Sequence, residues 1–135
     1  WQVENTVNHL VEKLSIKNLN YILSYQSRVG PLKWIGPSTE KTIKEEAKKQ
    51  KIIIVVPVAF VSEHSETLVE LDIEYKKIAI QNGSKDYIRV PAVTANQDFI
   101  NSLKSSILSA GNGELFTSSI RCLKKFKKCP RLQNI

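Results

Sequence analysis

Five carboxylates and one imidazole lie within residues 63–74, at spacings that could bind a cation. The set comprises Glu63, His64, Glu66, Glu70, Asp72 and Glu74. Residues 52–75 contain no lysine or arginine, although the chain has 20 of these residues. Like charges three or four positions apart on a helix destabilise it by a few tenths of a kcal/mol per pair. A cation from outside the chain would therefore supply the charge that this segment lacks.

The donor types favour a divalent transition metal. Imidazole nitrogen together with carboxylate oxygen suits Fe, Mn, Co or Zn. Residues of a regular α-helix are about 100° apart, which places four glutamates within an arc of roughly 80°: Glu63, Glu66, Glu70 and Glu74. His64 and Glu66 are roughly 200° apart on such a helix. They can share one ion only where the helix start is irregular or a second segment completes the site.

A solvated helix face is the alternative explanation for this acidic stripe. Acids in a first helical turn complement the helix macrodipole, which accounts for Glu63 and Glu66 but not for Glu70 and Glu74. A single histidine beside an apolar arc is more often a core residue than a ligand. The H-E-x-x-H pair of zinc hydrolases and the glycine-rich phosphate loops are absent from the sequence. The residues alone leave both explanations open.

The first half of the chain predicts a helix, a strand, a loop and a second helix. Apolar residues recur at helical spacing over residues 3–14. Residues 19–25 are apolar and β-prone, which predicts a buried strand, and the Gly-Pro pairs within residues 26–38 predict an ordered loop. Ser38 is the expected N-cap of a short helix over residues 39–50.

The second half predicts two further strands, each followed by a helix. Residues 52–60 are apolar on both faces, as in a strand covered by helices on each side of a parallel sheet, with a bulge or an edge at Pro57. Ser62 should cap the acidic helix, which would run to Gly83. A third strand over residues 86–93 precedes a helix from Asn96 to Gly111. The apolar arc expected to face the sheet comprises Leu68, Leu71, Tyr75, Ile78 and Ala79.

This order of elements predicts an α/β fold, a Rossmann-like doubly wound parallel sheet with right-handed crossovers. Ligands of such folds bind beyond the carboxyl ends of the strands. The loop over residues 26–38 and the start of the acidic helix are both expected there. We expect an α/β domain over residues 1–110 and a basic tail with two cysteines over residues 111–135.

Charge and composition narrow the classes of function. Residues 121–131 hold six basic residues and no acid, which accounts for six of the seven net positive charges. The rest of the chain is therefore nearly neutral, and we expect no nucleic-acid partner. The longest apolar run falls short of the roughly 20 residues that span a bilayer. The chain begins at Trp1 without a methionine, so we interpret it as a fragment. No signal peptide is visible, and the sparse cysteines suit a reducing compartment such as the cytoplasm.

Three segments of the sequence resemble the C-terminal half of ferrochelatases, in the family's order and spacing. They read QSRVGPLKW, VVPVAFVSEHSETLVELDIEY and YIRVPAV, and the resemblance covers residues 21–108. It implies one half of a chelatase fold, in which two Rossmann-like halves enclose a porphyrin cleft. The implied activity is the insertion of ferrous iron into protoporphyrin IX, or coproporphyrin, in heme biosynthesis.

The resemblance also implies roles for particular residues. Glu66 and His64 would be the catalytic pair. The path for metal or protons would comprise Glu63, His64, Glu66, Glu70 and Glu74, and the porphyrin pocket would be lined by Gln26, Ser27, Arg28 and Trp34. Carboxylates suit this reaction because metallation removes two pyrrole protons while adding a dication. Trp34 is otherwise explained as an ordinary packing residue between two turns.

Ferrous iron and the porphyrin are the implied substrates, and no cofactor is expected to be required. Some ferrochelatases hold a [2Fe-2S] cluster with four cysteines. The two thiols here, Cys122 and Cys129, cannot complete such a site, which argues against a cluster. The family's principal active-site histidine belongs to the N-terminal half, and neither His9 nor His64 matches it. We therefore expect that half of the enzyme as a partner, and no activity from this chain by itself.

Three alternatives stay open. The basic tail could contact the anionic inner face of a membrane as a peripheral anchor, or it could simply be solvated, which we favour. The enzyme could be a related tetrapyrrole chelatase that uses cobalt or nickel. In a different class, the chain could be a non-catalytic α/β domain whose acidic helix face docks a basic partner.

Overall fold

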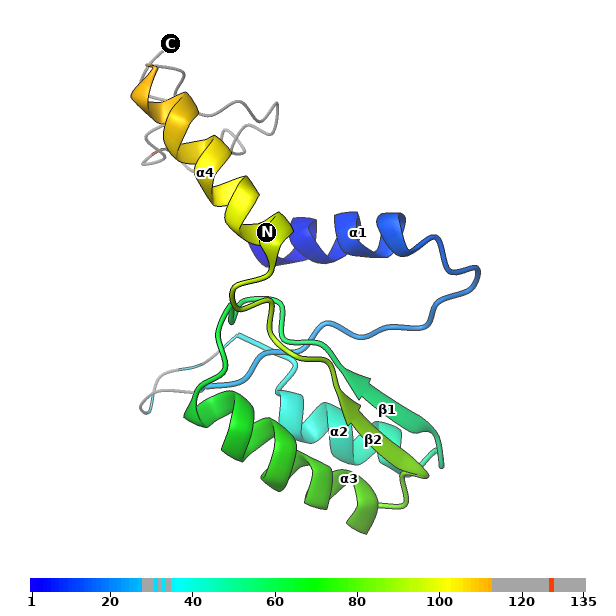
Figure 1. Ribbon diagram of the computed structural model, residues 1–135. Helices are drawn as coiled ribbons and strands as arrows, with labels where there is room; N and C mark the ends of the chain where they lie inside the picture. The colour runs from blue at the N-terminus through cyan, green and yellow to red at the C-terminus, as the bar shows by residue number, and fades with distance from the viewer. Residues whose placement is uncertain (28–30, 32, 34, 113–126, 128–135) are drawn as a thin grey trace. The chain divides into compact units, whose positions relative to one another are not determined.

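The computed structural model describes residues 1–27, 31, 33, 35–112 and 127. The chain divides into two compact units, Trp1–Thr94 and Ala95–Ile135. The described elements are α1 (Gln2–Leu14), α2 (Thr39–Ala47), β1 (Ile52–Val55), the π-helix η1 (Glu66–Tyr75), α3 (Lys76–Gln81) and β2 (Asp86–Arg89) in the first unit, and α4 (Gln97–Gly111) in the second (Figure 1). The fold is thus mixed α/β, as expected.

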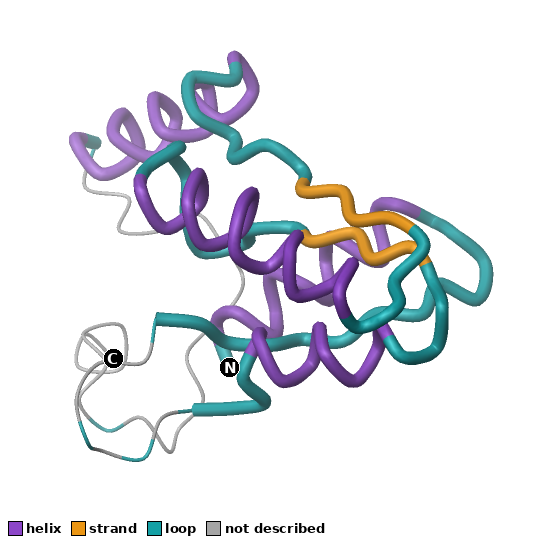
Figure 2. The backbone as a smooth tube through the Cα atoms, turned by 90° about the horizontal axis from the view of Figure 1, so that it is seen from below, coloured by secondary structure: helices purple, strands orange, loops and turns teal. Residues whose placement is uncertain are grey.

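Two short parallel strands form the sheet of the first unit. β1 and β2 pair from Ile52 opposite Asp86 to Val55 opposite Arg89, and they lie side by side in Figure 2. Both strands are shorter than the sequence predicts. Pro57 and Pro91 each stand two residues beyond a strand end, and a proline has no N–H to donate to a ladder.

Helices cover one face of this sheet. Ile53 and Val55 of β1 pack against a core cluster of Ile43 from α2, Ala79 from α3 and Tyr87 from β2. Side chains alternate between the two faces of a strand, so Ile52 and Ile54 point the other way and are 56% and 61% exposed. The prediction that residues 52–60 are covered on both faces is therefore wrong for the described part of the chain.

The predicted strand over residues 19–25 does not form. Its one ladder contact is a bridge at Tyr25, whose N–H donates to the carbonyl of Pro37 at 2.9 Å, while Thr39 donates to the carbonyl of Tyr25 at 3.0 Å. A cavity of about 570 Å³ is lined both by residues 20–27 and by residues 51–60. The apolar, β-prone composition led to a wrong prediction, because strand propensity largely reports packing against neighbouring strands. Residues 19–25 pair with neither β1 nor β2.

Polar side chains cap two helices as the sequence predicts. The Ser38 hydroxyl accepts from the N–H of Lys41 at the start of α2. The Asn96 side chain accepts from two N–H groups in the first turn of α4. α1 is also confirmed, and Gly83, at φ 98°, follows the end of α3 as the expected stop.

The acidic helix begins later than predicted, and Ser62 does not cap it. Its first residue is Glu66. Thr67 closes the entry turn instead, because its hydroxyl accepts from the N–H of His64 and donates to the His64 carbonyl, both at 2.8 Å. Thr67 is fully buried, so this small polar contact lies inside the fold.

The widened geometry of η1 changes which side chains face the core. A π-helix bonds i to i+5, so its turn is wider than the 3.6 residues of an α-helix. Burial accordingly recurs every four residues, at Thr67, Leu71, Tyr75 and Ala79. Leu68 was expected in the apolar arc but is 47% exposed, because the predicted arc assumed a regular helix.

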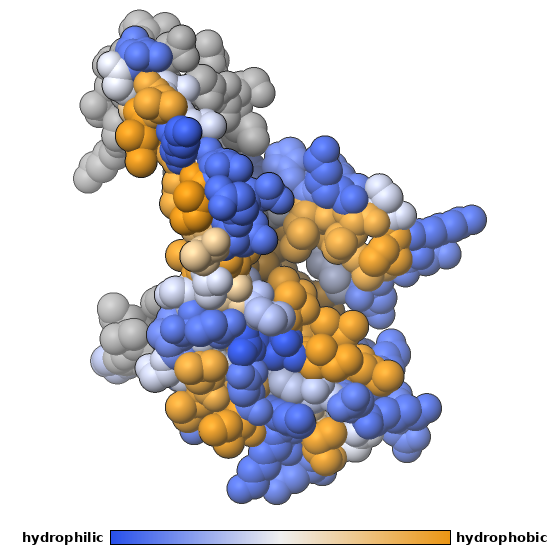
Figure 3. Space-filling view, in the orientation of Figure 1, coloured by the Kyte–Doolittle hydropathy of each residue, from blue (hydrophilic) through white to orange (hydrophobic). Residues whose placement is uncertain are grey.

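The second unit is described by α4 alone. This 15-residue helix has no buried residue. Its apolar residues are well exposed, as the orange surface along the helix in Figure 3 shows, and they comprise Ile100, Leu103, Ile107 and Leu108. Among the described residues, no helix is both long and apolar enough to cross a membrane.

Replacing Ser38 by alanine tests the cap of α2. The variant should lower the free energy of unfolding by about 1 kcal/mol, because one N–H of the first turn loses its acceptor. Urea unfolding followed by circular dichroism measures the change. Ser62→Ala is the matched control and should leave stability nearly unchanged, since Ser62 caps no helix. An equal loss in both variants would contradict this account of the helix starts.

Candidate active site

The site begins at the irregular entry to η1, where His64 is half-buried. Its ring meets the ring of Phe60 edge-on, with centroids 4.4 Å apart and an interplanar angle of 82°. The His64 Nδ1 accepts from the N–H of Glu66 at 3.3 Å. A neutral imidazole in this contact carries its proton on Nε2, so the outer nitrogen is a donor. The helix start is thus irregular, which is one of the two conditions under which His64 and Glu66 could serve one ion.

Two residues expected at the porphyrin contact two of the expected catalytic and metal residues. The Ser27 hydroxyl donates to Oε1 of Glu66. The Gln26 amide donates to Oε2 of Glu70 at 3.4 Å. Ser27 has φ 61°, a left-handed conformation that is uncommon for a residue other than glycine and recurs at functional sites. Residues from distant parts of the sequence are therefore brought together here, while Arg28 and Trp34 lie outside the described residues.

Glu66, Glu70 and Glu74 form a row along η1, four residues apart. Glu66 and Glu70 are half-buried, whereas Glu74 is exposed. Burial raises the pKa of Glu70 above its ordinary value, and the negative charges of Glu66 and Glu74 raise it further. Burial raises the pKa of Tyr75 to about 12, together with the negative charges of these three carboxylates and of Glu40. The repulsion inferred from the sequence is therefore present in the fold.

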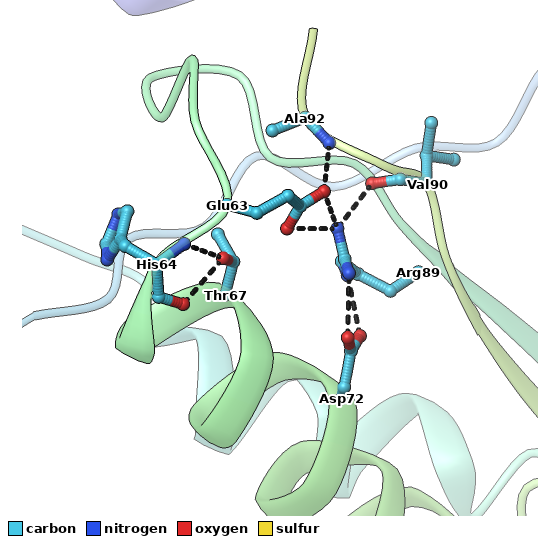
Figure 4. Close-up of polar contacts among 7 residues, drawn as sticks. All are labelled: Glu63, His64, Thr67, Asp72, Arg89, Val90 and Ala92. Atoms are coloured by element: carbon cyan, nitrogen blue, oxygen red, sulfur yellow. Dashed lines mark hydrogen bonds and ion pairs between the residues drawn. The ribbon is translucent and has the colours of Figure 1, made fainter. Parts of the chain in front are cut away.

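Glu63 and Asp72 do not belong to this row, because both are paired with Arg89 (Figure 4). The guanidinium Nη1 lies 2.7 Å from one carboxylate oxygen of Glu63, and Nε lies 2.6 Å from one of Asp72. Hydrogen bonds from Arg89 hold the pKa of both carboxyls below their ordinary values. The expectation that the acidic segment lacks an internal counter-ion is wrong for these two residues. The counter-ion comes from β2, outside the segment that is free of lysine and arginine.

The predicted metal residues are not gathered into a single coordination shell. Within residues 1–27, 31, 33, 35–112 and 127, no group of three or more His, Cys, Asp or Glu side chains is placed to hold a metal ion. Cys122 and Cys129 lie outside the described residues. The structure therefore offers a row of carboxylates beside one imidazole, and the metal roles of the individual residues stay predictions.

Sequence reasoning missed Thr67 and Arg89. Nothing in the sequence indicated a structural role for Thr67 except its place next to Glu66. Arg89 had one, because it shares a strand face with Tyr87 in the run DYIR, and a cation on the inner face of a strand needs an acidic partner. The acidic segment over residues 63–74 precedes it along the chain, with α3 between them.

Comparison with known proteins identifies the class. A sequence profile described as ferrochelatase matches residues 1–110. The chain belongs to the ferrochelatase family.

Individual relatives agree with this assignment. The chain is 58% identical over 136 residues to the ferrochelatase of Pelagibacter ubique (strain HTCC1062), with 98% of this chain and 40% of the relative covered. It is 48% identical over 135 residues to each of the ferrochelatases of Rickettsia prowazekii (strain Madrid E) and Rickettsia typhi (strain ATCC VR-144 / Wilmington), with 96% of this chain and 39% of each relative covered. The chain therefore spans about two fifths of the length of the curated relatives that it matches.

Replacing Glu70 by glutamine should stabilise the folded chain at neutral pH. The pKa of Glu70 is raised on folding, so ionisation costs stability as the pH rises through the ordinary value near 4.5 and on through the raised one. Below the ordinary value both states are protonated, and the advantage of glutamine should vanish. Urea unfolding at about pH 7 and about pH 3.5 measures the difference.

Glu45→Gln is the control for this prediction. Glu45 lies on the exposed surface of α2 and pairs with Lys41 at 3.8 Å, so its replacement should bring no gain at neutral pH. A Glu70→Gln variant that is less stable than the parent chain at neutral pH would show that the carboxylate row is not under repulsion.

Proposed function

We propose that this chain is the part of a ferrochelatase that supplies the carboxylates for metal insertion. The whole enzyme would insert ferrous iron into protoporphyrin IX or coproporphyrin, in heme biosynthesis. The observation that carries the proposal is the contact of Ser27 and Gln26 with Glu66 and Glu70, inside the region that matches the family. Family membership supports the activity, and this contact supports the place of the site.

Metal insertion requires a base that faces the porphyrin nitrogens. Two pyrrole protons must leave as the dication enters, so a nearby carboxylate that accepts protons assists both events. Glu66 is the proposed base, because it is half-buried and Ser27 occupies its Oε1. Its other oxygen then faces the substrate. His64 is proposed as its partner, since the backbone N–H of Glu66 donates to Nδ1 of the imidazole.

The row of glutamates provides a proposed route to that base. Glu74 is exposed, Glu70 is half-buried and Glu66 contacts the loop residue Ser27. A hydrated ferrous ion could be drawn in by Glu74 and Glu70, and protons could leave along the same row. The raised pKa of Glu70 suits proton transfer near neutral pH better than an ordinary carboxyl does.

The other parts of the enzyme are proposed from the family. The porphyrin would lie against the loop that carries Gln26, Ser27, Arg28 and Trp34, and a second, N-terminal half would close the cleft. β1 and β2 are parallel with helices between them, which suits one edge of a doubly wound sheet. We further propose a cytoplasmic enzyme, with the basic tail of residues 111–135 either solvated or resting on the inner face of the membrane.

Glu66→Gln tests the proposed base. The assay uses a chimera in which this chain replaces the matching segment of the Pelagibacter ubique ferrochelatase, and it follows porphyrin metallation by absorbance. We expect turnover to fall by about 100-fold or more, because glutamine cannot accept a proton. Circular dichroism should be unchanged. Glu45→Gln in the same chimera should keep full activity, and near-normal turnover of the Glu66→Gln enzyme would count against the assignment.

The chain expressed by itself should show negligible chelatase activity. It spans only about 40% of the Pelagibacter ubique relative, and the proposed cleft needs groups from the remainder. Metallation by the purified chain is compared with that of the chimera at equal concentration. Rapid heme formation by the chain by itself would refute the proposed division of the site.

Two alternatives have their own tests. A chelatase for cobalt or nickel would prefer those ions over ferrous iron when they compete in the chimera assay. A non-catalytic docking domain would capture a basic partner in a manner that depends on Glu70 and Glu74, without any shift in porphyrin absorbance.

A further inference from the structure

Arg89 ties together three segments of the first unit. It is the last residue of β2, and its side chain is only 10% exposed. Nε and Nη2 donate to the two oxygens of Asp72 at 2.6 and 2.7 Å, and Nη1 donates to the two oxygens of Glu63 at 2.7 and 2.9 Å. All three guanidinium nitrogens are thus engaged. The contact joins the strand end to the middle of η1 and to the loop before it.

Glu63 is held on both sides by this arrangement. Its Oε1 accepts from Arg89 and also from the backbone N–H of Ala92 at 2.8 Å. Charge-assisted hydrogen bonds such as these are shorter and stronger than hydrogen bonds between neutral groups. Both oxygens of Glu63 are therefore committed to the protein, which leaves this carboxylate poorly placed to act as a ligand for an incoming ion.

The position of Glu63 sets the position of His64. Residues 56–64 form no regular helix or strand, so few backbone hydrogen bonds fix their path. The described contacts that do so include the Glu63 carboxylate with Arg89 and Ala92, and the Thr94 N–H with the Val61 carbonyl at 2.7 Å. His64 is also held from η1, by Thr67 and by the Leu68 N–H, which donates to the His64 carbonyl at 2.9 Å. His64 follows Glu63 directly, and its Nδ1 accepts from the N–H of Glu66.

We propose that Arg89 is a positioning residue for metal insertion, which acts through Glu63 to hold His64 and Glu66 in their productive arrangement. The inference rests on the proposed function of Glu66 and His64. It reassigns Glu63 from the metal path to the scaffold of the site. It also separates the acidic segment into two sets, with Glu63 and Asp72 as anchors and with Glu66, Glu70 and Glu74 left for substrates.

Arg89→Lys in the chimera is the first test. Lysine keeps the positive charge but presents a single ammonium group, which cannot span two carboxylates as the guanidinium does. We expect kcat to fall at least about 10-fold while the KM for ferrous iron stays unchanged. The His64 ring proton signals, read by NMR, should shift as its contact with Phe60 changes. Lys49→Gln removes the ion pair between Glu46 of α2 and the exposed Lys49 just after this helix, and it is the control that should change none of these readouts.

Glu63→Gln distinguishes an anchor from a metal ligand. An anchor predicts the same loss of kcat as in Arg89→Lys, an unchanged KM for ferrous iron, and little further loss in the double variant, because both changes break one contact. A metal ligand predicts a raised KM for ferrous iron in Glu63→Gln alone and additive losses in the double variant. That result would overturn the inference, as would a folded Arg89→Lys enzyme with unchanged kcat.

The outcomes remain informative if a variant does not fold. Should Arg89→Lys fail to fold, Glu63→Gln decides alone through the split between kcat and KM. The proposed function is tested separately by Glu66→Gln: activity retained there refutes the base, whereas activity lost there and retained in Arg89→Lys refutes only the positioning role.

Discussion

One guanidinium group at the end of β2 compensates two carboxylates, Glu63 and Asp72, that come from the loop before η1 and from η1 itself. Without Arg89, Glu63 and Asp72 would both lose the guanidinium with which they are paired. A partly buried ion pair is costly to form and costlier to break on one side. It therefore holds the loop, the π-helix and the strand end in one arrangement. We propose that the remaining acids, Glu66, Glu70 and Glu74, are the ones that meet the substrates.

This division explains how a nearly neutral domain can carry a concentrated negative row. Glu66, Glu70 and Glu74 stay close enough to perturb one another, so the fold keeps the repulsion and does not relieve it with lysine. Functional sites that bind charged ligands commonly lower the stability of the folded protein in this way. Ser27 and Gln26 contact the row from a loop far away in the sequence, which links the proposed metal path to the segment proposed to line the porphyrin pocket.

Local signals in the sequence predicted much of the fold. Ser38 and Asn96 lie directly before apolar helical patterns, and a cap depends only on residues within one turn. The contact between Ser27 and Glu66 could also be predicted from the sequence, because both residues are expected where ligands of α/β folds bind. The absence of a strand over residues 19–25 and the pairing of Arg89 could not be predicted from the sequence. Each depends on which residues from another part of the chain lie next to it. The π-helix left no distinct trace, because residues spaced by four fit an α-helix nearly as well.

The four-residue repeat of η1 has a geometric consequence for the acids that it carries. In an α-helix, positions four apart drift around the axis by roughly 40° at each step. In the wider turn of η1, residues four apart drift less in that direction, both in the row of Thr67, Leu71 and Tyr75 and in the row of Glu66, Glu70 and Glu74. The three carboxylates are then nearly aligned along the helix, so an ion on the proposed path would meet the same kind of ligand at regular intervals. Deleting a single residue between Glu66 and Glu74 would turn one end of the row of carboxylates out of line with the other.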